Sequence, residues 1–170
     1  AQALEAGADI INDISGLRDP EMLAVAARYG APVIAMHMQG TPQTMQDNLH
    51  YDDVVSEVHA ELVEAVRKAR AQGVKVMVDP GIGFGKTHEH NLALLRHLDR
   101  LRVDACPMLL GTSRKGFIGR LLDLPVNERV EGTMATVALG VSQGVDMVRV
   151  HDVKEAVRTV RVADALVRRP

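Results

Sequence analysis

The segment Val74-Lys75-Val76-Met77-Val78-Asp79-Pro80-Gly81 joins a short apolar run to a carboxylate, a proline and a glycine-rich loop. The run is rich in valine and typical of a buried β-strand. An amphipathic segment precedes it, at about 52–72, with apolar residues at every third or fourth position. A second helical pattern, with leucines on one face, follows the loop. The segment is therefore one strand in an alternation of strands and helices.

The same alternation is predicted along the rest of the chain. Asp19-Pro20 predicts a helix start, and the spacing of Asp152 and Glu155 predicts a capping box at the start of the last helix. Glycines at 30, 73 and 144 predict helix ends. Further helical segments are expected up to 122 and at about 127–143. The predicted strands are 9–14, 32–38, 74–79, 107–111 and 145–150.

Strands that read as continuous apolar runs are typical of a parallel sheet with both faces buried. Two α/β architectures fit this pattern: an open doubly wound sheet, or part of a (β/α)8 TIM barrel. A complete barrel has eight strands and about 250 residues. The chain has 170 residues and opens, up to Gly7, like the end of a helix. We therefore expect a partial barrel with five βα units, the last five strands, in a single domain over 1–170 that lacks its first three units.

Composition excludes several classes of protein. The net charge is −2 and aromatic residues are 2% of the chain, so nucleic-acid binding is not expected. No apolar run approaches the ~18 residues of a membrane-spanning helix. The one cysteine, Cys106, precludes an internal disulfide and fits a reducing compartment. We expect a cytoplasmic protein that does not bind membranes.

Polar residues recur where the predicted strands end. In parallel α/β folds this edge binds ligands. A fixed carboxylate such as Asp79 can accept two parallel N–H bonds from a ligand or an arginine. Asn12 either contacts a ligand or caps the following turn. The residues at this edge are Asn12, His37, Asp79, Ser113, Arg114, Lys115, Arg149 and His151.

Cations gather at the same edge, since Lys86 adds to Arg114, Lys115, Arg149 and His151. Together with the start of the last helix, they indicate a phosphate or pyrophosphate site. Lys86 and Arg114 can equally be solvated loop charges. Arg149 lies in a predicted buried strand, so its charge requires a ligand or a carboxylate partner.

Other polar residues are assigned to structure. Asp13 is interpreted as structural or solvated, and His37 as a packed strand residue. His88 and His90 lack the further ligands that a zinc site needs. Cys106 stands at the entrance of a strand, the end of a barrel that serves stability, so it is not expected to act as a nucleophile.

Five motifs together resemble bacterial dihydropteroate synthase, in the right order across almost the whole chain. They are Ile11-Asn12-Asp13-Ile14, Met36-His37-Met38-Gln39-Gly40-Thr41-Pro42, Asp79-Pro80-Gly81-Ile82-Gly83-Phe84-Gly85-Lys86, Gly111-Thr112-Ser113-Arg114-Lys115 and Arg149-Val150-His151-Asp152. The resemblance implies a TIM-barrel transferase of folate synthesis. Such an enzyme joins 6-hydroxymethyl-7,8-dihydropterin pyrophosphate to p-aminobenzoate, and it releases 7,8-dihydropteroate and pyrophosphate.

The resemblance also implies roles for single residues. The pterin contacts the positions of Asn12, Met36, Asp79, Lys115 and Arg149. The pyrophosphate contacts Arg149 and His151, and the p-aminobenzoate site, which sulfonamides also occupy, is lined by Phe84, Ser113 and Lys115. Gly111 belongs to the substrate-binding set. Lys115, Arg149 and His151 form the implied catalytic set, which acts by stabilising charge as pyrophosphate leaves.

Further expectations come from what the family has and this chain lacks. Loops of the first three strands carry an Asn that helps bind Mg²⁺, so no metal ligand is expected within these 170 residues. The family also implies a homodimer. We expect the chain by itself to be unstable and to lack synthase activity.

Two other functions are compatible with the residues. A methyltransferase that uses methyltetrahydrofolate would share Asn12 and Asp79, but it would not need the cations around Ser113 and His151. An inactive homologue could retain the fold as a binding or structural protein.

Overall fold

The computed structural model describes residues 1–47 and 49–167, in which strands and helices alternate. The strands are β1 (Ile11–Asp13), β2 (Val33–Met36), β3 (Val76–Asp79), β4 (Leu109–Leu110) and β5 (Met147–Val148). The helices are α1 (Gln2–Glu5), α2 (Pro20–Tyr29), α3 (Val54–Ala71), α4 (His88–Arg96), α5 (Gly116–Leu122), α6 (Val130–Ser142) and α7 (Val153–Val167), with 3-10 turns η1 (Leu98–Leu101) and η2 (Val126–Glu128). The predicted alternation is confirmed.

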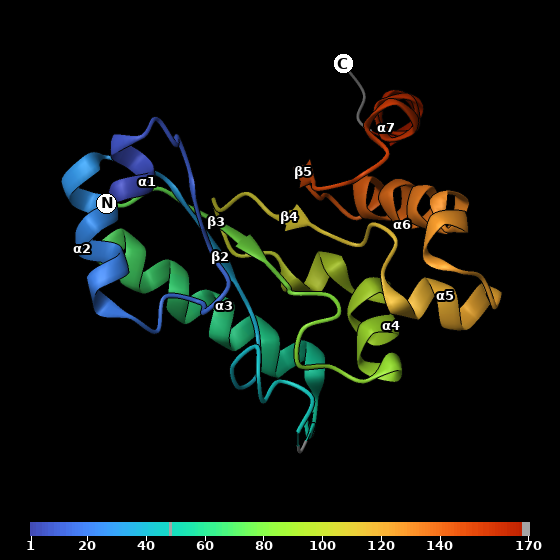
Figure 1. The fold of residues 1–170 in the computed structure, drawn as a ribbon, viewed down its shortest axis with the longest axis horizontal. Helices are drawn as coiled ribbons and strands as arrows, with labels where there is room; N and C mark the ends of the chain where they lie inside the picture. Colours follow the sequence, from blue (N-terminus) through green and yellow to red (C-terminus); the bar gives the residue numbers. More distant parts are fainter. Residues whose placement is uncertain (48, 168–170) are drawn as a thin grey trace.

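The five strands are parallel and follow one another in chain order. β1, β2 and β3 form one sheet, β4 and β5 form a second, and a bridge between Val78 and Met108 joins them. Parallel strands in sequential order, joined by right-handed crossovers, place all connecting helices on the same face. A doubly wound sheet reverses its strand order, so the arrangement is that of a partial barrel (Figure 1).

Several helix boundaries follow from local sequence. The Asp19 carboxylate accepts a hydrogen bond from the backbone N–H of Glu21, and Pro20 opens α2, as predicted. Asp53 caps α3 in the same way. The segment expected at about 127–143 divides into η2 and α6. The predicted strands are too long, at both ends in four cases and only at the start for β3, because backbone pairing covers only part of each apolar run.

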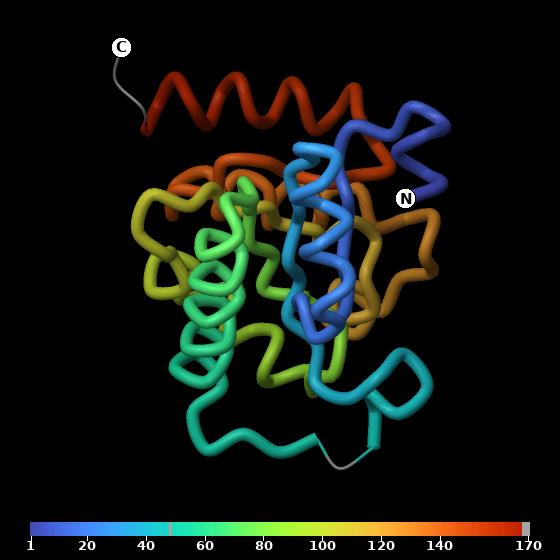
Figure 2. Tube along the Cα trace, turned by 90° about the vertical axis from the view of Figure 1, so that its left-hand side faces the viewer, coloured from blue at the N-terminus to red at the C-terminus, as the bar shows by residue number. Residues whose placement is uncertain are grey.

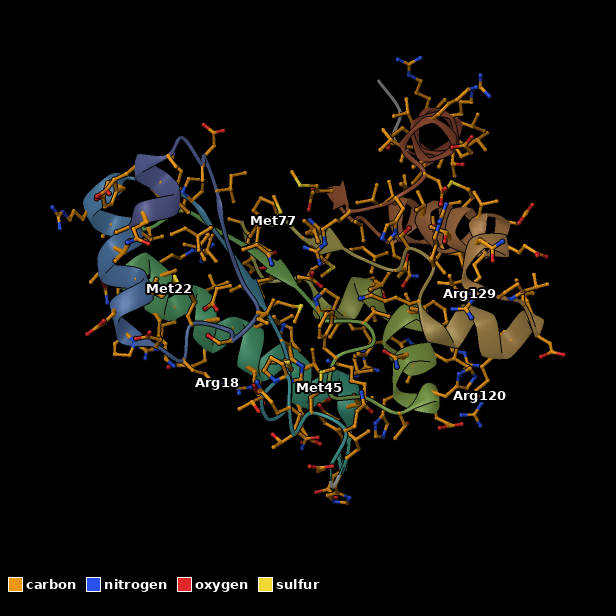
Figure 3. All side chains as sticks on the ribbon, viewed as in Figure 1. Arg18, Met22, Met45, Met77, Arg120 and Arg129 are labelled. Carbon is orange, nitrogen blue, oxygen red and sulfur yellow. The ribbon has the colours of Figure 1, made fainter. Side chains whose placement is uncertain are left out.

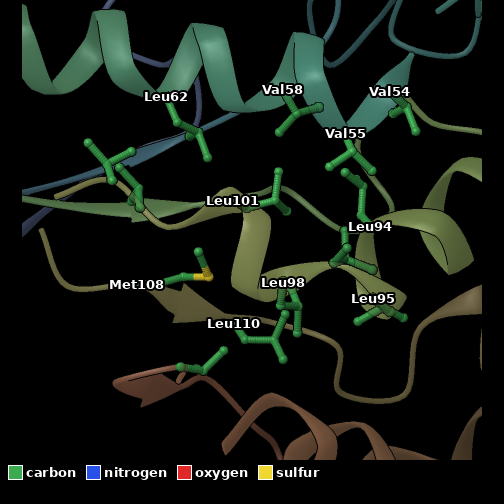
Figure 4. Packing of buried hydrophobic residues seen from close by; sticks show 14 of the residues in the cluster. Val54, Val55, Val58, Leu62, Leu94, Leu95, Leu98, Leu101, Met108 and Leu110 are labelled. Carbon is green, nitrogen blue, oxygen red and sulfur yellow. The ribbon is translucent and has the colours of Figure 1, made fainter. Parts of the chain in front are cut away.

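The main core lies between the helices and the outer face of the sheet (Figure 4). Leucines and valines of α3, α4 and η1 meet Val78, Met108 and Leu110 of the strands there. Each fully buried leucine stabilises the fold by about 2 kcal/mol relative to an exposed one. This packing holds the strand ends in place.

The two outermost strands are less covered than predicted. Asn12 in β1 and Met147 in β5 are exposed, whereas all of β2 is buried. The expectation that every strand is buried on both faces is therefore wrong for β1 and β5, since each pairs with only one neighbour among the described strands. Figure 2 shows α7 crossing beside α6 at this end of the sheet.

None of the helices in the described part of the chain combines the length and the hydropathy that a transmembrane span requires.

Candidate functional site

Strand register places three predicted site residues on one face of the sheet. Asn12 pairs with Ile34, and Met36 pairs with Asp79. Paired residues of parallel strands share a face, and side chains alternate with a period of two. Asn12, Met36 and Asp79 therefore all belong to the inner face, opposite the helical core.

The Arg149 guanidinium joins two of these strands to the end of β5. Its Nη1 donates to Asn12 Oδ1 at 3.0 Å, and its Nη2 donates to Asp79 Oδ2 at 3.0 Å. The predicted carboxylate partner of Arg149 is thus Asp79. Arg149 itself is not buried, since 44% of its side chain is exposed, compared with 2% for Asp79. The guanidinium covers a carboxylate that would otherwise form the floor of the site.

Asp79 is the most buried carboxylate of the site. Its second oxygen accepts the backbone N–H of Gly81 at 2.8 Å. Burial raises the pKa of Asp79, while the Gly81 N–H and the positive charges of Arg149 and Lys115 oppose that rise. A carboxylate has about four acceptor positions, of which these two bonds use two.

Gly111 allows the guanidinium to lie close to the backbone. A Cβ at this position would stand 3.0 Å from Arg149 Nη2 and 3.5 Å from its Cζ. Any larger residue would push the guanidinium away from Asp79. Gly111 thus acts through its lack of a side chain.

Ser113 and His151 connect the loop after β4 to the segment after β5. The backbone N–H of His151 donates to Ser113 Oγ at 3.0 Å, and Ser113 Oγ lies 2.8 Å from His151 Nδ1. Because the hydroxyl accepts the backbone bond, its own hydrogen is free to donate to Nδ1. This assignment leaves Nε2 of a neutral His151 as the N–H donor.

Lys115 stands between the loops that follow β3 and β4. Its Nζ donates to the carbonyl of Ile82 and lies 4.7 Å from the centre of the Phe84 ring, within the range of a cation–π contact. Burial lowers the pKa of Lys115 to about 8, and the charge of Asp79 opposes this shift. Beyond the Ile82 bond, the ammonium retains donors for a ligand.

Two adjoining cavities contain these groups. One has a volume of about 230 Å³ and is lined by Phe84, Gly111, Ser113, Lys115, Arg149, Val150 and His151. The other has a volume of about 910 Å³ and is lined by Asn12 and Arg149 with mostly apolar residues of β2, β4, β5 and α7. Arg149 lines both cavities. Nine residues were predicted to bind substrate or to act in catalysis, and eight of them either line one of these cavities or bond directly to Arg149.

Met36 is the exception. Its side chain is fully buried, and it lines a separate cavity of about 310 Å³ between β2 and α3. Its predicted contact with a ligand stays a prediction, although register places it beside Asp79.

Two cations that were predicted to join the cluster at the site do not face the cavities. Lys86 is buried, and its Nζ bonds to His37 Nδ1 and to the carbonyls of Gly81 and Phe84. Arg114 forms a two-bond ion pair with Asp152. Neither is a solvated loop charge or a free anion ligand, since each is paired within the protein.

The Arg114–Asp152 pair replaces the predicted capping box at the start of α7. The Asp152 carboxylate accepts from Nε and Nη2 of Arg114 at 3.0 and 2.5 Å. Arg114 has a left-handed backbone with φ 56°. Arg129 (Figure 3) donates to the carbonyl of Arg114 and so holds that conformation. The pair fixes the loop that presents Ser113 and Lys115.

Three residues assigned to structure behave accordingly. The Asp13 carboxylate caps the turn that follows β1, accepting from the backbone of Ser15 and Leu17. His37 is buried and packed beneath the site. Burial raises the pKa of Cys106, which disfavours a reactive thiolate.

The described residues offer no cluster of three His, Cys, Asp or Glu side chains that could hold a metal ion. Of the acidic residues at this edge, Asp79 and Asp152 are each bonded to an arginine, and the Asp13 carboxylate caps the turn after β1. These residues therefore do not fit a protein-bound magnesium ion, and the implied Mg²⁺ stays a prediction.

Comparisons with known proteins agree with this geometry. Residues 1–151 match the family model described as "Pterin binding enzyme". A dihydropteroate synthase of Synechocystis is 50% identical over an alignment 170 positions long, which covers 97% of this chain. The dihydropteroate synthase of Thermus thermophilus was solved in complex with 6HMPPP and in complex with 4-aminobenzoate. Both structures have a TM-score of 0.93 and 45% identity over 97% of this chain.

The match covers only part of these proteins. The chain spans 59% of the length of the Synechocystis relative, and it covers 67% and 69% of the two Thermus chains.

Proposed function

The chain belongs to the family of pterin-binding enzymes, and we propose that it forms the substrate-binding part of a dihydropteroate synthase. The proposed reaction joins 6-hydroxymethyl-7,8-dihydropterin pyrophosphate to p-aminobenzoate. We further propose that residues 1–170 form a single pterin-binding domain. The observation that carries the proposal is the shared position of an amide, a buried carboxylate and a guanidinium, since Arg149 bonds to both Asn12 and Asp79.

These three groups fit a pterin. The pterin ring presents N3–H and a 2-amino group as a pair of donors, which matches the two oxygens of the Asp79 carboxylate. Its flat face suits stacking by a planar guanidinium. The inner-face cavity beside Asn12 and Arg149 is mostly apolar, as a flat heterocycle requires.

Arg149 occupies the donor position before the substrate arrives. Its Nη2 bonds to Asp79 Oδ2, one of the two carboxylate oxygens that would receive the pterin donors. In the proposed complex the guanidinium leaves Asp79 and moves over the ring face. Its exposure and the absence of a side chain at Gly111 give it room to move.

The smaller cavity suits p-aminobenzoate. Phe84 provides an apolar wall, Lys115 provides donors for a carboxylate, and Ser113 also lines the cavity. In solved relatives, Thermus thermophilus dihydropteroate synthase binds 4-aminobenzoate and a Yersinia pestis dihydropteroate synthase binds a sulfonamide drug. We propose that both ligand types bind this cavity.

The proposed chemistry needs stabilised charge more than a nucleophile. The bond between the pterin methylene carbon and the pyrophosphate oxygen breaks, and both electrons leave with pyrophosphate. The amine of p-aminobenzoate then bonds to that carbon and releases a proton. Lys115, Arg149 and His151 would stabilise the departing negative charge, and Asp79 would stabilise the pterin cation.

Calorimetry on the full-length gene product tests the proposal. Asp79→Asn and Arg149→Ala are each titrated with the pterin pyrophosphate, beside the exposed control Asp99→Asn. We expect both site variants to bind at least about tenfold more weakly, because each loses a charge-assisted bond. Unchanged binding in both would exclude this site.

The methyltransferase alternative makes the opposite prediction. The bonded pair of Ser113 and His151 favours the pyrophosphate substrate, because a methylfolate has no anion at that end. Tighter binding of methyltetrahydrofolate than of the pterin pyrophosphate would support the alternative.

Magnesium, a homodimer and a cytoplasmic location remain proposals drawn from the family resemblance. So does the inactivity of the 170-residue chain by itself. Large apolar side chains stand exposed on α7, including Val153, Val162 and Leu166. Self-association of the isolated chain, measured by sedimentation, would agree with this expectation, whereas turnover by it would contradict it.

A further inference from the structure

The Lys86 ammonium has a complete set of partners within the protein. Its Nζ lies 2.8 Å from His37 Nδ1, 3.0 Å from the Gly81 carbonyl and 2.9 Å from the Phe84 carbonyl. A protonated lysine has three N–H donors, and these three acceptors use all of them. Lys86 therefore has no donor left for a substrate.

The contact with His37 determines which ring nitrogen carries the proton. Because Nδ1 accepts from Lys86, the hydrogen of a neutral imidazole belongs on Nε2. Burial lowers the pKa of His37, which favours the neutral ring. Nε2 faces the Glu61 carboxylate of α3 at 3.6 Å. The hydrogen-bonded connection thus runs from His37, after β2, to the loop after β3, with the Glu61 carboxylate nearby on α3.

The loop held by Lys86 carries Phe84 into the proposed p-aminobenzoate site. Lys86 contacts the carbonyls of its first and fourth residues, Gly81 and Phe84. The loop lies directly on β2, since a Cβ on Gly81 would stand only 1.8 Å from the His37 carbonyl oxygen. Without the ammonium, the buried carbonyls of the loop would lose a shared donor.

We propose that Lys86 is a positioning residue for the p-aminobenzoate site: its ammonium closes the loop 81–86 on His37 and so places the Phe84 ring beside Lys115. The proposal rests on the proposed function for the identity of the ligand. The arrangement of the loop is independent of that identity. Lys86 acts through Phe84 and not by contact with substrate.

Kinetics of Lys86→Met in the full-length gene product test this role. Methionine keeps the length and apolar character of the lysine stem but removes its donors. We expect the KM for p-aminobenzoate to rise roughly tenfold or more, because the site loses its alignment. The dissociation constant of the pterin pyrophosphate should rise less than this KM, since Asn12 and Arg149 are not held by Lys86 and only the Gly81 N–H links the loop to Asp79.

Lys75→Met is the matched control, because Lys75 is exposed and lies just before β3, at the end away from the site. It should leave both constants unchanged. An unaltered KM for p-aminobenzoate in Lys86→Met, or an equal loss of affinity for both substrates, would overturn the proposal.

A measurement on the unmutated protein covers the case in which Lys86→Met does not fold. Nitrogen-15 NMR of the His37 ring below pH 7, where Lys86 is protonated, should show the Nε2–H tautomer. An Nδ1–H tautomer at that pH would exclude donation from the Lys86 ammonium and overturn the proposal. If the unmutated protein binds no pterin pyrophosphate, the proposed function fails while this NMR result still decides the state of the loop.

Discussion

The loops that follow β3 and β4 each contain a lysine that is removed from solvent, yet the two lysines have different surroundings. Lys86 is surrounded by acceptors of its own protein, which are His37 Nδ1 and the carbonyls of His37, Gly81 and Phe84. Lys115 donates to one carbonyl, of Ile82, and otherwise faces the Phe84 ring and the smaller cavity.

The difference separates a structural charge from a binding charge. A cation whose donors are all used within the protein holds the backbone in place, whereas one with unused donors beside a cavity can receive a ligand. Both lysines feel the negative charge of Asp79, which raises the pKa of each against the effect of burial. The number of acceptors, and not burial alone, distinguishes their roles.

Removing the binding charge should have the largest effect. Lys115→Met should lower kcat/KM for synthesis roughly 100-fold or more, because one preorganised donor in a buried site contributes about that much. Steady-state kinetics of the full-length gene product provide the measurement. If Lys86→Met lowered kcat/KM more than Lys115→Met, the division of roles between the two lysines would be wrong.

The second largest effect is expected from neutralising Asp79, whose charge acts on both lysines. Asp79→Asn should weaken pterin binding about 10- to 100-fold, which corresponds to the loss of a hydrogen bond to a charged group. Titration calorimetry checks the affinity. The pKa of Lys115, followed by NMR of its Nζ, should also fall in this variant, because an opposing negative charge is gone. An unshifted Lys115 would contradict the assigned electrostatics.

Titration of the structural lysine, Lys86, should make the free energy of unfolding depend on pH. Burial lowers the pKa of Lys86 to about 7, so the unfolded chain binds more protons between that value and its ordinary value of 10.5. The free energy of unfolding should therefore rise with pH from 7 towards 10, by less than about 1.4 kcal/mol per pH unit. Urea unfolding at several pH values, compared with Lys86→Met, isolates this effect. A difference between the two proteins that does not change with pH would refute it.

The ion pair beside the second loop should matter least. In this pair 33% of the Arg114 side chain and 14% of the Asp152 side chain are exposed. Arg114→Gln should lower the free energy of unfolding by about 1 kcal/mol or less, as for other partly exposed pairs. Thermal unfolding measures the loss. A much larger loss of activity than of stability would show that Arg114 contacts the substrate directly.

Much of the fold was predictable from local patterns. Apolar runs and glycine stops located every strand, because burial imposes that pattern on a parallel sheet. The strand ends were not predictable, since they depend on backbone pairing with neighbours. β5, expected over 145–150, pairs only at Met147 and Val148.

The sequence allowed the site residues to be identified, but it did not predict all of their hydrogen-bond partners. Residues at strand ends meet at one edge in any parallel α/β fold, which is why Asn12, Asp79 and Arg149 could be grouped. His37, which contacts Lys86, and Asp152, which pairs with Arg114, lie 49 and 38 positions away in the sequence, beyond any local pattern. The same distant contact displaced the capping box expected at Asp152.

A crystal structure of the full-length gene product with the pterin pyrophosphate tests the central claim most directly. The pterin donor edge should bond to Asp79, with the Arg149 guanidinium withdrawn from that carboxylate and stacked on the ring. A ligand bound elsewhere, with Arg149 still bonded to both Asn12 and Asp79, would contradict the account.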